Sequence, residues 1–253
     1  MSVYITGDTH GDFNRLSDDA FPEHNGPGAG DFVIICGDFG GVWDGSPEEN
    51  ARLDWLNERP FTTLFISGNH ENFDLLDALP VERWNGGMVQ RVRPGILHLL
   101  RGQRYEIGER TFFTMGGAGS RILRILKPND PLLRVKSEWF SFRKAQFWIE
   151  HVNWFRQELP GESEYQTARK TLDECGWSVD YIITHCAPTS IQNMLDLREA
   201  QEKGSYLPNR LTDFLDELVN RARFQYWFLG HYHGDAVIND KYVILYEKMI
   251  RLD

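Results

Sequence analysis

The chain has 253 residues, with 27 basic and 37 acidic side chains and a formal net charge of −10. It is 41% hydrophobic and 25% charged, which is typical of a globular protein and excludes a fibrous or disordered one. The negative charge argues against an extended nucleic-acid surface, because a polyanion is repelled on average. The three cysteines form no C-x-x-C pair, which argues against a disulfide framework and a structural zinc knuckle.

The N-terminal residues contain neither the basic segment nor the long apolar segment of a signal peptide. No apolar stretch approaches the ~18 residues that a membrane span needs. We therefore expect a cytoplasmic protein without membrane contacts. No internal repeat or Pro/Gly/Ser-rich linker marks a boundary, so residues 1–253 are expected to form a single domain.

Short apolar runs typical of buried strands occur at residues 3–6, 32–36, 63–67, 111–115, 181–184 and 226–229. Two hairpins are predicted, the first from 105–107 and 111–115 and the second from 235–238 and 242–246. Helical patterns occur at residues 47–57, 140–159, 164–175 and 207–223; the first of these has Ser46 as its expected N-cap. This alternation predicts an α/β fold with a largely parallel sheet and antiparallel pieces late in the chain.

Five of these strands run directly into a polar loop. The loops read Gly7-Asp8-Thr9-His10, Gly37-Asp38, Gly68-Asn69-His70-Glu71, Thr184-His185 and Gly230-His231-Tyr232-His233. In α/β sheets, ligands bind at the carboxyl ends of the strands, so we expect the five loops to meet in one cleft. Any one loop alone is more simply explained as a hydrogen-bonded turn, but five such loops together predict a functional site.

The residue types in these loops indicate a metal centre. Carboxylate, amide and imidazole ligands without a thiolate suit manganese, iron or zinc. Seven donors are too many for one ion, whereas two ions that share a carboxylate would use them all. Two ions ~3.5–4 Å apart can clamp a phosphoryl group and activate a water molecule.

The five motifs, in this order, resemble those of the calcineurin-like metallophosphoesterases, and they extend from residue 7 to residue 233. The resemblance implies a four-layer sandwich of two mixed β-sheets flanked by helices, with a dinuclear metal site at the C-terminal ends of the strands. It implies hydrolysis of a phosphomonoester or phosphodiester by a metal-bridging hydroxide. The expected cofactor is a pair of divalent ions, manganese first, with iron or zinc as alternatives.

The resemblance also assigns roles to individual residues. The first ion would be held by Asp8, His10, Asp38 and His233. The second ion would be held by Asp38, Asn69, His185 and His231, with Asp38 bridging. His70 would not bind metal and would act as the catalytic residue beside the leaving group.

The substrate is less well specified. Serine/threonine phosphoprotein phosphatases of this family carry Asp and Arg at the third and fourth positions after the bridging Asp, where this chain has Gly41 and Val42. Asp44 or Asp74 could replace the missing Asp. A phosphoprotein phosphatase is therefore the alternative function, and a non-catalytic metal-bound interaction module is a further one. The expected partner is a small phosphorylated substrate or a phosphopeptide.

Two residues are candidates for binding the substrate. Arg121 follows a Gly-rich turn and begins a stretch, up to Lys144, that is rich in basic residues; such a stretch could equally be a solvated surface. Trp43 follows the Asp38 loop and could face the substrate. The aromatic residues between positions 139 and 155 have helical spacing and are interpreted as a core-facing stripe.

Overall fold

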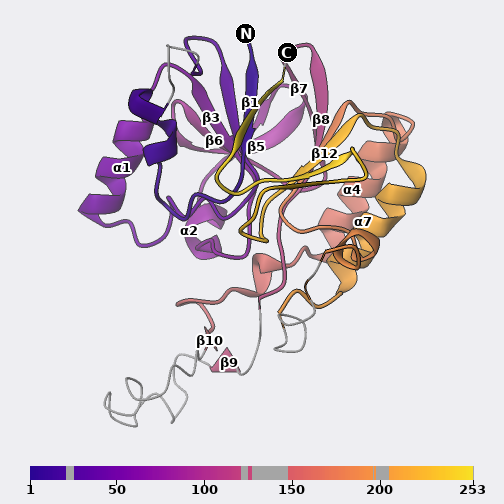
Figure 1. Cartoon of the computed structure of the whole chain (residues 1–253). Helices are drawn as coiled ribbons and strands as arrows, with labels where there is room; N and C mark the ends of the chain where they lie inside the picture. Colours follow the sequence, from indigo (N-terminus) through magenta and orange to yellow (C-terminus); the bar gives the residue numbers. More distant parts are fainter. Residues whose placement is uncertain (21–25, 121–124, 127–147, 196, 198–204, 253) are drawn as a thin grey trace.

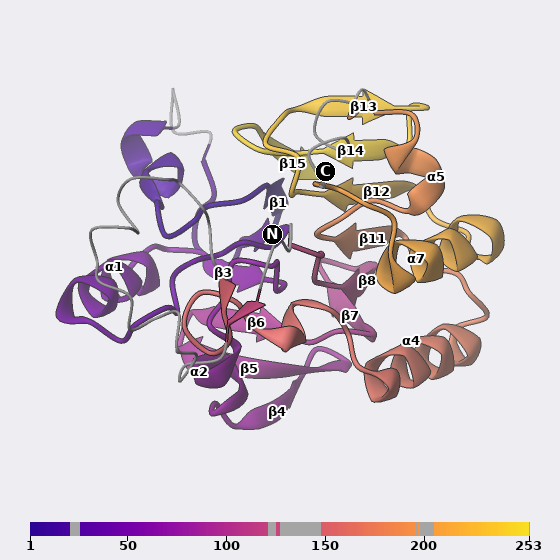
Figure 2. The ribbon, with the colours of Figure 1, turned by 90° about the horizontal axis from the view of Figure 1, so that it is seen from below.

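The computed structural model describes residues 1–20, 26–120, 125–126, 148–195, 197 and 205–252. Two β-sheets pack face to face, and helices cover the outer face of each sheet (Figures 1 and 2). In the described part of the chain, no helix is both long enough and apolar enough to cross a membrane.

The first sheet is built mainly from the N-terminal half of the chain. Its strands are β1 (Val3–Thr6), β2 (Phe32–Ile35), β3 (Thr62–Phe65), β4 (Val81–Trp84), β5 (Gly87–Arg93), β6 (Ile96–Leu99) and β15 (Met249–Leu252). Their order is β15-β1-β2-β3-β6-β5-β4. The neighbours among β1, β2, β3 and β6 are parallel, whereas β15, β5 and β4 pair antiparallel with their neighbours.

The second sheet is built from strands between residues 103 and 244. Its strands are β7 (Gln103–Ile107), β8 (Arg110–Met115), β11 (Tyr181–Thr184), β12 (Tyr226–Leu229), β13 (Ala236–Ile238) and β14 (Tyr242–Ile244). Their order is β13-β14-β12-β11-β8-β7, and the four inner strands are parallel. A small parallel pair, β9 (Ile125–Leu126) and β10 (Trp148–Ile149), lies apart from both sheets (Figure 1).

The helices fall into two groups. Beside the first sheet lie α1 (Pro47–Asn57), α2 (Phe73–Asp77) and the short 3-10 helices η1 (Asn14–Leu16) and η2 (Asp18–Ala20). Beside the second sheet lie α4 (Glu162–Glu174), α5 (Thr189–Gln192) and α7 (Arg210–Arg221) (Figure 2). Another 3-10 helix, η5 (Arg156–Glu158), precedes α4.

Three apolar layers hold the sandwich together. The middle layer joins the two sheets and includes Ile5 and Leu64 from the first sheet and Phe112 and Ile183 from the second. A second layer packs α1 and α2 on the first sheet, and a third packs α4, α5 and α7 on the second. The order of helices, sheet, sheet and helices confirms the predicted α/β fold with two mixed sheets.

Many of the predicted elements are confirmed. The strands at 3–6, 181–184 and 226–229 match to the residue, both hairpins form, and α1 has the predicted bounds. The Ser46 side chain accepts a hydrogen bond from Glu49 N, as an N-cap does. The predicted helices 164–175 and 207–223 correspond to α4 and α7. All three cysteines are free, and Cys36 is buried in the core.

The helix predicted at 140–159 is wrong over its described part. Residues 140–147 lie outside the described residues, residues 148–149 form a strand, and residues 156–158 form a 3-10 helix. Trp154 and Phe155 are adjacent in sequence, and both are buried. The aromatic side chains here are therefore buried without the spacing of an amphipathic helix.

Candidate metal centre

The five polar loops all follow parallel strands at the centre of a sheet. The strands β1, β2 and β3 are neighbours in the first sheet, and β11 and β12 are neighbours in the second. Because the two sheets pack face to face, the carboxyl ends of these strands come together. The predicted meeting of the loops is therefore what the structure shows.

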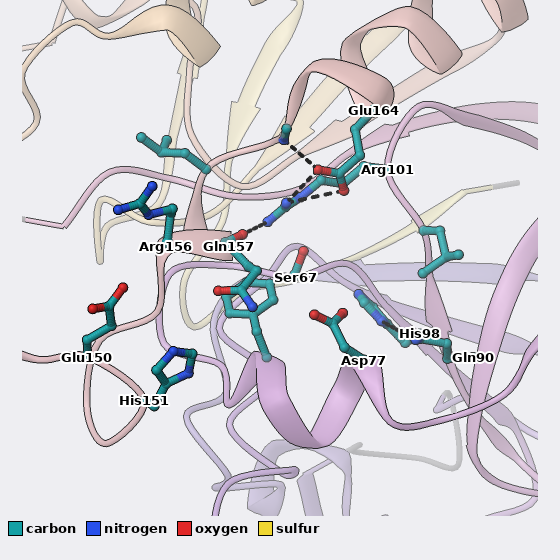
Figure 3. Close-up of a pocket in the computed structure, with 14 residues that line it drawn as sticks. Ser67, Asp77, Gln90, His98, Arg101, Glu150, His151, Arg156, Gln157 and Glu164 are labelled. Atoms are coloured by element: carbon teal, nitrogen blue, oxygen red, sulfur yellow. Dashed lines mark hydrogen bonds and ion pairs between the residues drawn. The ribbon is translucent and has the colours of Figure 1, made fainter. Parts of the chain in front are cut away.

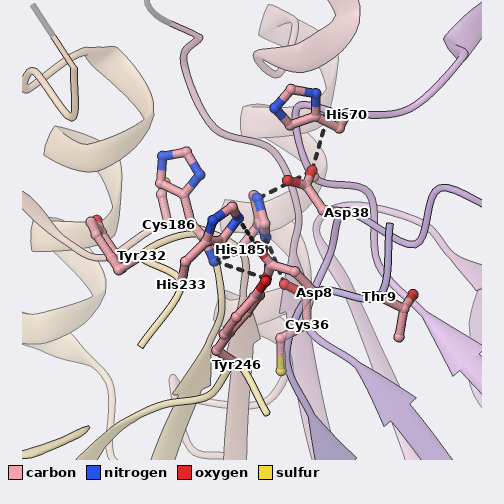
Figure 4. A network of polar contacts seen from close by, with 12 residues as sticks. Asp8, Thr9, Cys36, Asp38, His70, His185, Cys186, Tyr232, His233 and Tyr246 are labelled. Atoms are coloured by element: carbon pink, nitrogen blue, oxygen red, sulfur yellow. Dashed lines mark hydrogen bonds and ion pairs between the residues drawn. The ribbon is translucent and has the colours of Figure 1, made fainter. Parts of the chain in front are cut away.

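Four candidate ligands form one compact group. Asp8, His10, Asp38 and His233 each offer an atom, and these atoms lie within 4.8 Å of one another. The Nε2 atoms of His10 and His233 are 3.2 Å apart. His233 Nε2 lies 3.3 Å from Asp8 Oδ2 (Figure 4). These four residues are the set that the sequence resemblance assigns to the first ion.

His185 is fully buried between two carboxylates. Its Nδ1 donates to the Cys36 carbonyl at 2.7 Å, which leaves Nε2 deprotonated in the neutral ring and able to bind a metal. Nε2 has no hydrogen-bond partner among the described residues and lies 3.3 Å from Asp38 Oδ1. Burial opposes a charge on this ring, but Asp38 and Asp8 outweigh it and raise the pKa of His185 to about 9. The position therefore favours a positive charge.

His231 and Asn69 complete the predicted second ligand set. The His231 ring centroid is 4.9 Å from that of His185, and its backbone N–H donates to Asp8 Oδ1 at 2.9 Å. Burial and the charge of His185 lower the pKa of His231 to about 3, so the ring is neutral, as a ligand must be. The Oδ1 atom of Asn69 is buried without a hydrogen-bond partner in the described part of the chain.

The backbone at four of these residues is strained. The φ angles of His10, Asp38, His231 and His233 are 47°, 47°, 74° and 48°. Residues other than glycine adopt this left-handed backbone conformation at a cost of about 1–3 kcal/mol each. They keep it only when the surrounding structure holds them there. Such strain is concentrated at functional sites, and here it falls on four candidate ligands.

Two glycines are needed because the side chains of candidate ligands approach them closely. A Cβ atom on Gly68 would lie 2.0 Å from Asp38 Oδ1, and one on Gly230 would lie 2.2 Å from Asp8 Oδ1. The glycine in each motif thus makes room for the carboxylate that another loop supplies. The sequence motifs therefore encode contacts between loops as well as turns.

Comparison with known proteins agrees with this geometry. The family model described as calcineurin-like phosphoesterase matches residues 1–235. The chain belongs to this family. Its members are hydrolases that act on phosphoester bonds, so the predicted enzyme class is confirmed.

The chain is also similar to the human lariat debranching enzyme. The two sequences are 25% identical over 258 aligned residues, which cover 92% of this chain and 42% of the relative. The chain therefore spans about two fifths of the length of this relative.

Glu71 fastens two of the phosphoesterase loops together. Its buried carboxylate accepts hydrogen bonds from the backbone N–H groups of Phe39 at 2.8 Å, Gly40 at 3.3 Å and Gly68 at 3.3 Å. The loop that carries Asp38 is thereby fixed to the loop that carries Asn69. The sequence motif contains Glu71, but its spacing alone gave no role for this side chain.

His70 lies beside the bridging candidate. Its backbone N–H donates to Asp38 Oδ1 at 2.8 Å (Figure 4). Its ring centroid is 5.4 Å from that of His10. The two acids considered as its partners have other contacts: Asp44 accepts from Ser46 N, and Asp74 pairs with His151 Nδ1 at 2.9 Å. The catalytic role of His70 remains a prediction.

Of the two substrate-binding candidates, the structure describes Trp43 but not Arg121. Arg121 lies outside the described residues, as does most of the basic stretch. Trp43 is half-buried, its ring packs edge-on against Phe155, and its carbonyl accepts from Asn72. Tyr246, for which the sequence gave no signal, stacks on the His233 ring with centroids 4.7 Å apart.

Proposed function

We propose that this phosphoesterase holds two divalent ions and hydrolyses phosphodiesters. The observation that carries the proposal is the position of Asp38. Its carboxylate lies 3.7 Å from His10 Nε2 on one side and 3.3 Å from His185 Nε2 on the other. A carboxylate between two groups of nitrogen and oxygen donors is suited to bridging a pair of ions.

The donor sets fit two such ions. One set comprises Asp8, His10, Asp38 and His233, and the other comprises Asp38, Asn69, His185 and His231. The mixture of oxygen and imidazole donors suits manganese first, and iron or zinc as well. Divalent ions bound there would polarise a phosphoryl oxygen and lower the pKa of a water molecule.

Residues outside the two donor sets have the remaining roles in this proposal. His70, held beside Asp38 by its backbone hydrogen bond, is the proposed proton donor to the departing oxygen or the group that stabilises its charge. Glu71 and the two close-approach glycines hold the ligand loops in register. The entropy cost of ordering these loops is therefore incurred once, during folding, and not at each turnover.

Two observations support a diester as the substrate. Gly41 and Val42 replace the Asp and Arg expected of a phosphoprotein phosphatase. The lariat debranching enzyme, to which the chain is similar, is a phosphodiesterase. With a net charge of −10, the proposed substrate is a short diester rather than a long duplex.

The test compares p-nitrophenyl phosphate with bis-p-nitrophenyl phosphate in the presence of Mn²⁺. Wild type should hydrolyse the diester faster, Asp38→Asn should lose both activity and bound metal, and His70→Ala should lose activity alone. No Mn²⁺-dependent turnover of either compound would refute the enzyme proposal and favour an interaction module. Preference for the monoester, with turnover of a phosphopeptide, would favour a phosphoprotein phosphatase instead.

A further inference from the structure

The orientation of the Asn69 side chain is set by a hydrogen bond to Ser120. Asn69 Nδ2 lies 3.2 Å from Ser120 Oγ, while Asn69 Oδ1 is buried without a partner in the described part of the chain. The two ends of an amide have nearly the same shape, so only their hydrogen bonds decide which end points where. The donor or acceptor state of Ser120 therefore decides which atom Asn69 presents to the metal centre.

Glu158 determines whether Ser120 Oγ donates to Asn69 or accepts from it. Its carboxylate accepts from Ser120 N at 2.9 Å and from Ser120 Oγ at 2.6 Å, and its side chain is almost fully buried. The second distance lies in the range of an O–H···O⁻ hydrogen bond. A hydroxyl group has one hydrogen, and here Glu158 accepts it. Ser120 Oγ can then only accept from Asn69, so the amide N–H₂ faces Ser120 and Oδ1 faces away.

Glu158 is itself held in place by Arg101. The Nη2 atom of this almost buried arginine donates to the carbonyls of Gln157 at 2.7 Å and Glu158 at 3.3 Å. Its Nη1 atom lies 3.3 Å from the Glu164 carboxylate at the start of α4 (Figure 3). The segment that carries Glu158 is thereby fastened to the body of the fold, at the rim of a cavity of about 520 Å³.

We infer that Ser120 and Glu158 are positioning residues that aim Asn69 Oδ1 at the second metal ion. The inference rests on the proposed function, in which Asn69 is a ligand of that ion. Neither Ser120 nor Glu158 belongs to the five motifs, and neither touches the reacting atoms in this scheme. Their contribution is to select one of two amide orientations, and outer partners of this kind change metal affinity by about 10–100-fold.

The decisive variant is Glu158→Gln, which keeps the shape of the side chain and reverses only its hydrogen bond with Ser120 Oγ. The glutamine carbonyl would still accept from Ser120 N, so its N–H₂ group would face Ser120 Oγ. The hydroxyl would then donate to Asn69, whose oxygen would turn away from the ion. We expect the second Mn²⁺ to bind about 10–100-fold more weakly while the first binds as in wild type.

The readouts are calorimetric titration with Mn²⁺ and the electron paramagnetic resonance signal of a coupled Mn²⁺ pair. Ser120→Ala should show the same selective weakening, because it also frees the amide to rotate. The matched control is Asp216→Asn, since Asp216 accepts from both N and Oγ of Ser190 in a pair that joins α5 to α7. This control should keep both Mn²⁺ affinities.

A further variant separates the two proposals. If Asn69→Ala still binds two Mn²⁺ ions tightly, the ligand assignment in the proposed function is wrong. If Asn69→Ala loses the second ion but Glu158→Gln and Ser120→Ala keep it, the positioning role is refuted and the proposed function stands. If Glu158→Gln does not fold, Ser120→Ala decides: weakened second-ion binding supports the positioning role, and unchanged binding overturns it.

Discussion

We expect Gly68→Ala to disable the metal centre although it changes none of the proposed ligands. The added Cβ would lie 2.0 Å from Asp38 Oδ1 and 2.4 Å from Asp38 N, against 3.4 Å for an ordinary contact. The carboxylate oxygen must therefore move by about 1.4 Å, and the backbone nitrogen by about 1.0 Å, relative to Gly68. Misplacement by ~1 Å can reduce a rate by about 100-fold, and overpacking costs about 1–3 kcal/mol.

The assay has two parts. Turnover of bis-p-nitrophenyl phosphate with Mn²⁺ should fall by about 100-fold or more, given the displacement above. The rise in Tm that we expect Mn²⁺ to cause in wild type should be lost, because a misplaced Asp38 would no longer serve both proposed ions.

The matched control is Gly45→Ala. Gly45 has a φ of +67°, and the structure places no described atom within 4 Å of an added Cβ. The strain of a left-handed alanine costs about 1–2 kcal/mol, a loss similar to that of the test variant. Gly45→Ala should keep its Mn²⁺ response. A Gly68→Ala protein with the Mn²⁺ affinity and turnover of wild type would refute the steric reasoning.

The remaining predictions are independent of that glycine. His70→Ala should lower kcat by about 10²–10⁴-fold and keep the Mn²⁺-induced rise in Tm; loss of metal binding would contradict a role outside the ligand set. EDTA should abolish turnover, and each ion restored at 100 times its Kd should add about 2.7 kcal/mol to the free energy of unfolding, measured by urea titration. Arg121→Ala should raise KM with little loss of bound metal, and unchanged kinetics would remove it from the site. Burial opposes the charge on Asp180, but hydrogen bonds from Thr111 outweigh it and hold its pKa below the usual value. Asp180→Asn should therefore lower the urea midpoint of the metal-free protein at pH 7, and the difference should shrink as the pH falls below about 4. A difference that persists at low pH would mean that the charge is not responsible.

The sequence predicted the strands that lead to the site because each is a short apolar run that stops at a glycine or polar residue. It predicted poorly the strands whose stability comes from their neighbours. In β4, Val81, Glu82 and Arg83 are all exposed, so no apolar run marks the strand. In β15, half-buried residues pair with β1 across almost the whole chain, a contact that no local pattern records.

In the site, too, the sequence predicted the features that a local pattern marks and missed those that depend on packing between segments. The convergence of the loops follows from a rule about parallel strands, and could be predicted from Asp8, Asp38 and His185 alone. The contacts that orient the ligands depend on how separate segments pack. Ser120 and Glu158 are 38 residues apart, and Tyr246 meets His233 only because β14 returns beside β12. These residues carry no motif, so the sequence alone could not predict them.

The pairing of β1 with β15 has a consequence for the order of assembly. Residues 3–6 lie beside residues 249–252, so the strand that leads to Asp8 keeps one open edge until the end of β15 has been made. Contacts of such long sequence separation form slowly, and a nascent chain exposes unpaired edges in the meantime. The proposed metal pocket also needs His233 from the late part of the chain. Ion capture is therefore expected to be among the last events of folding, and the rate of Mn²⁺ uptake during refolding would time the closure of the first sheet.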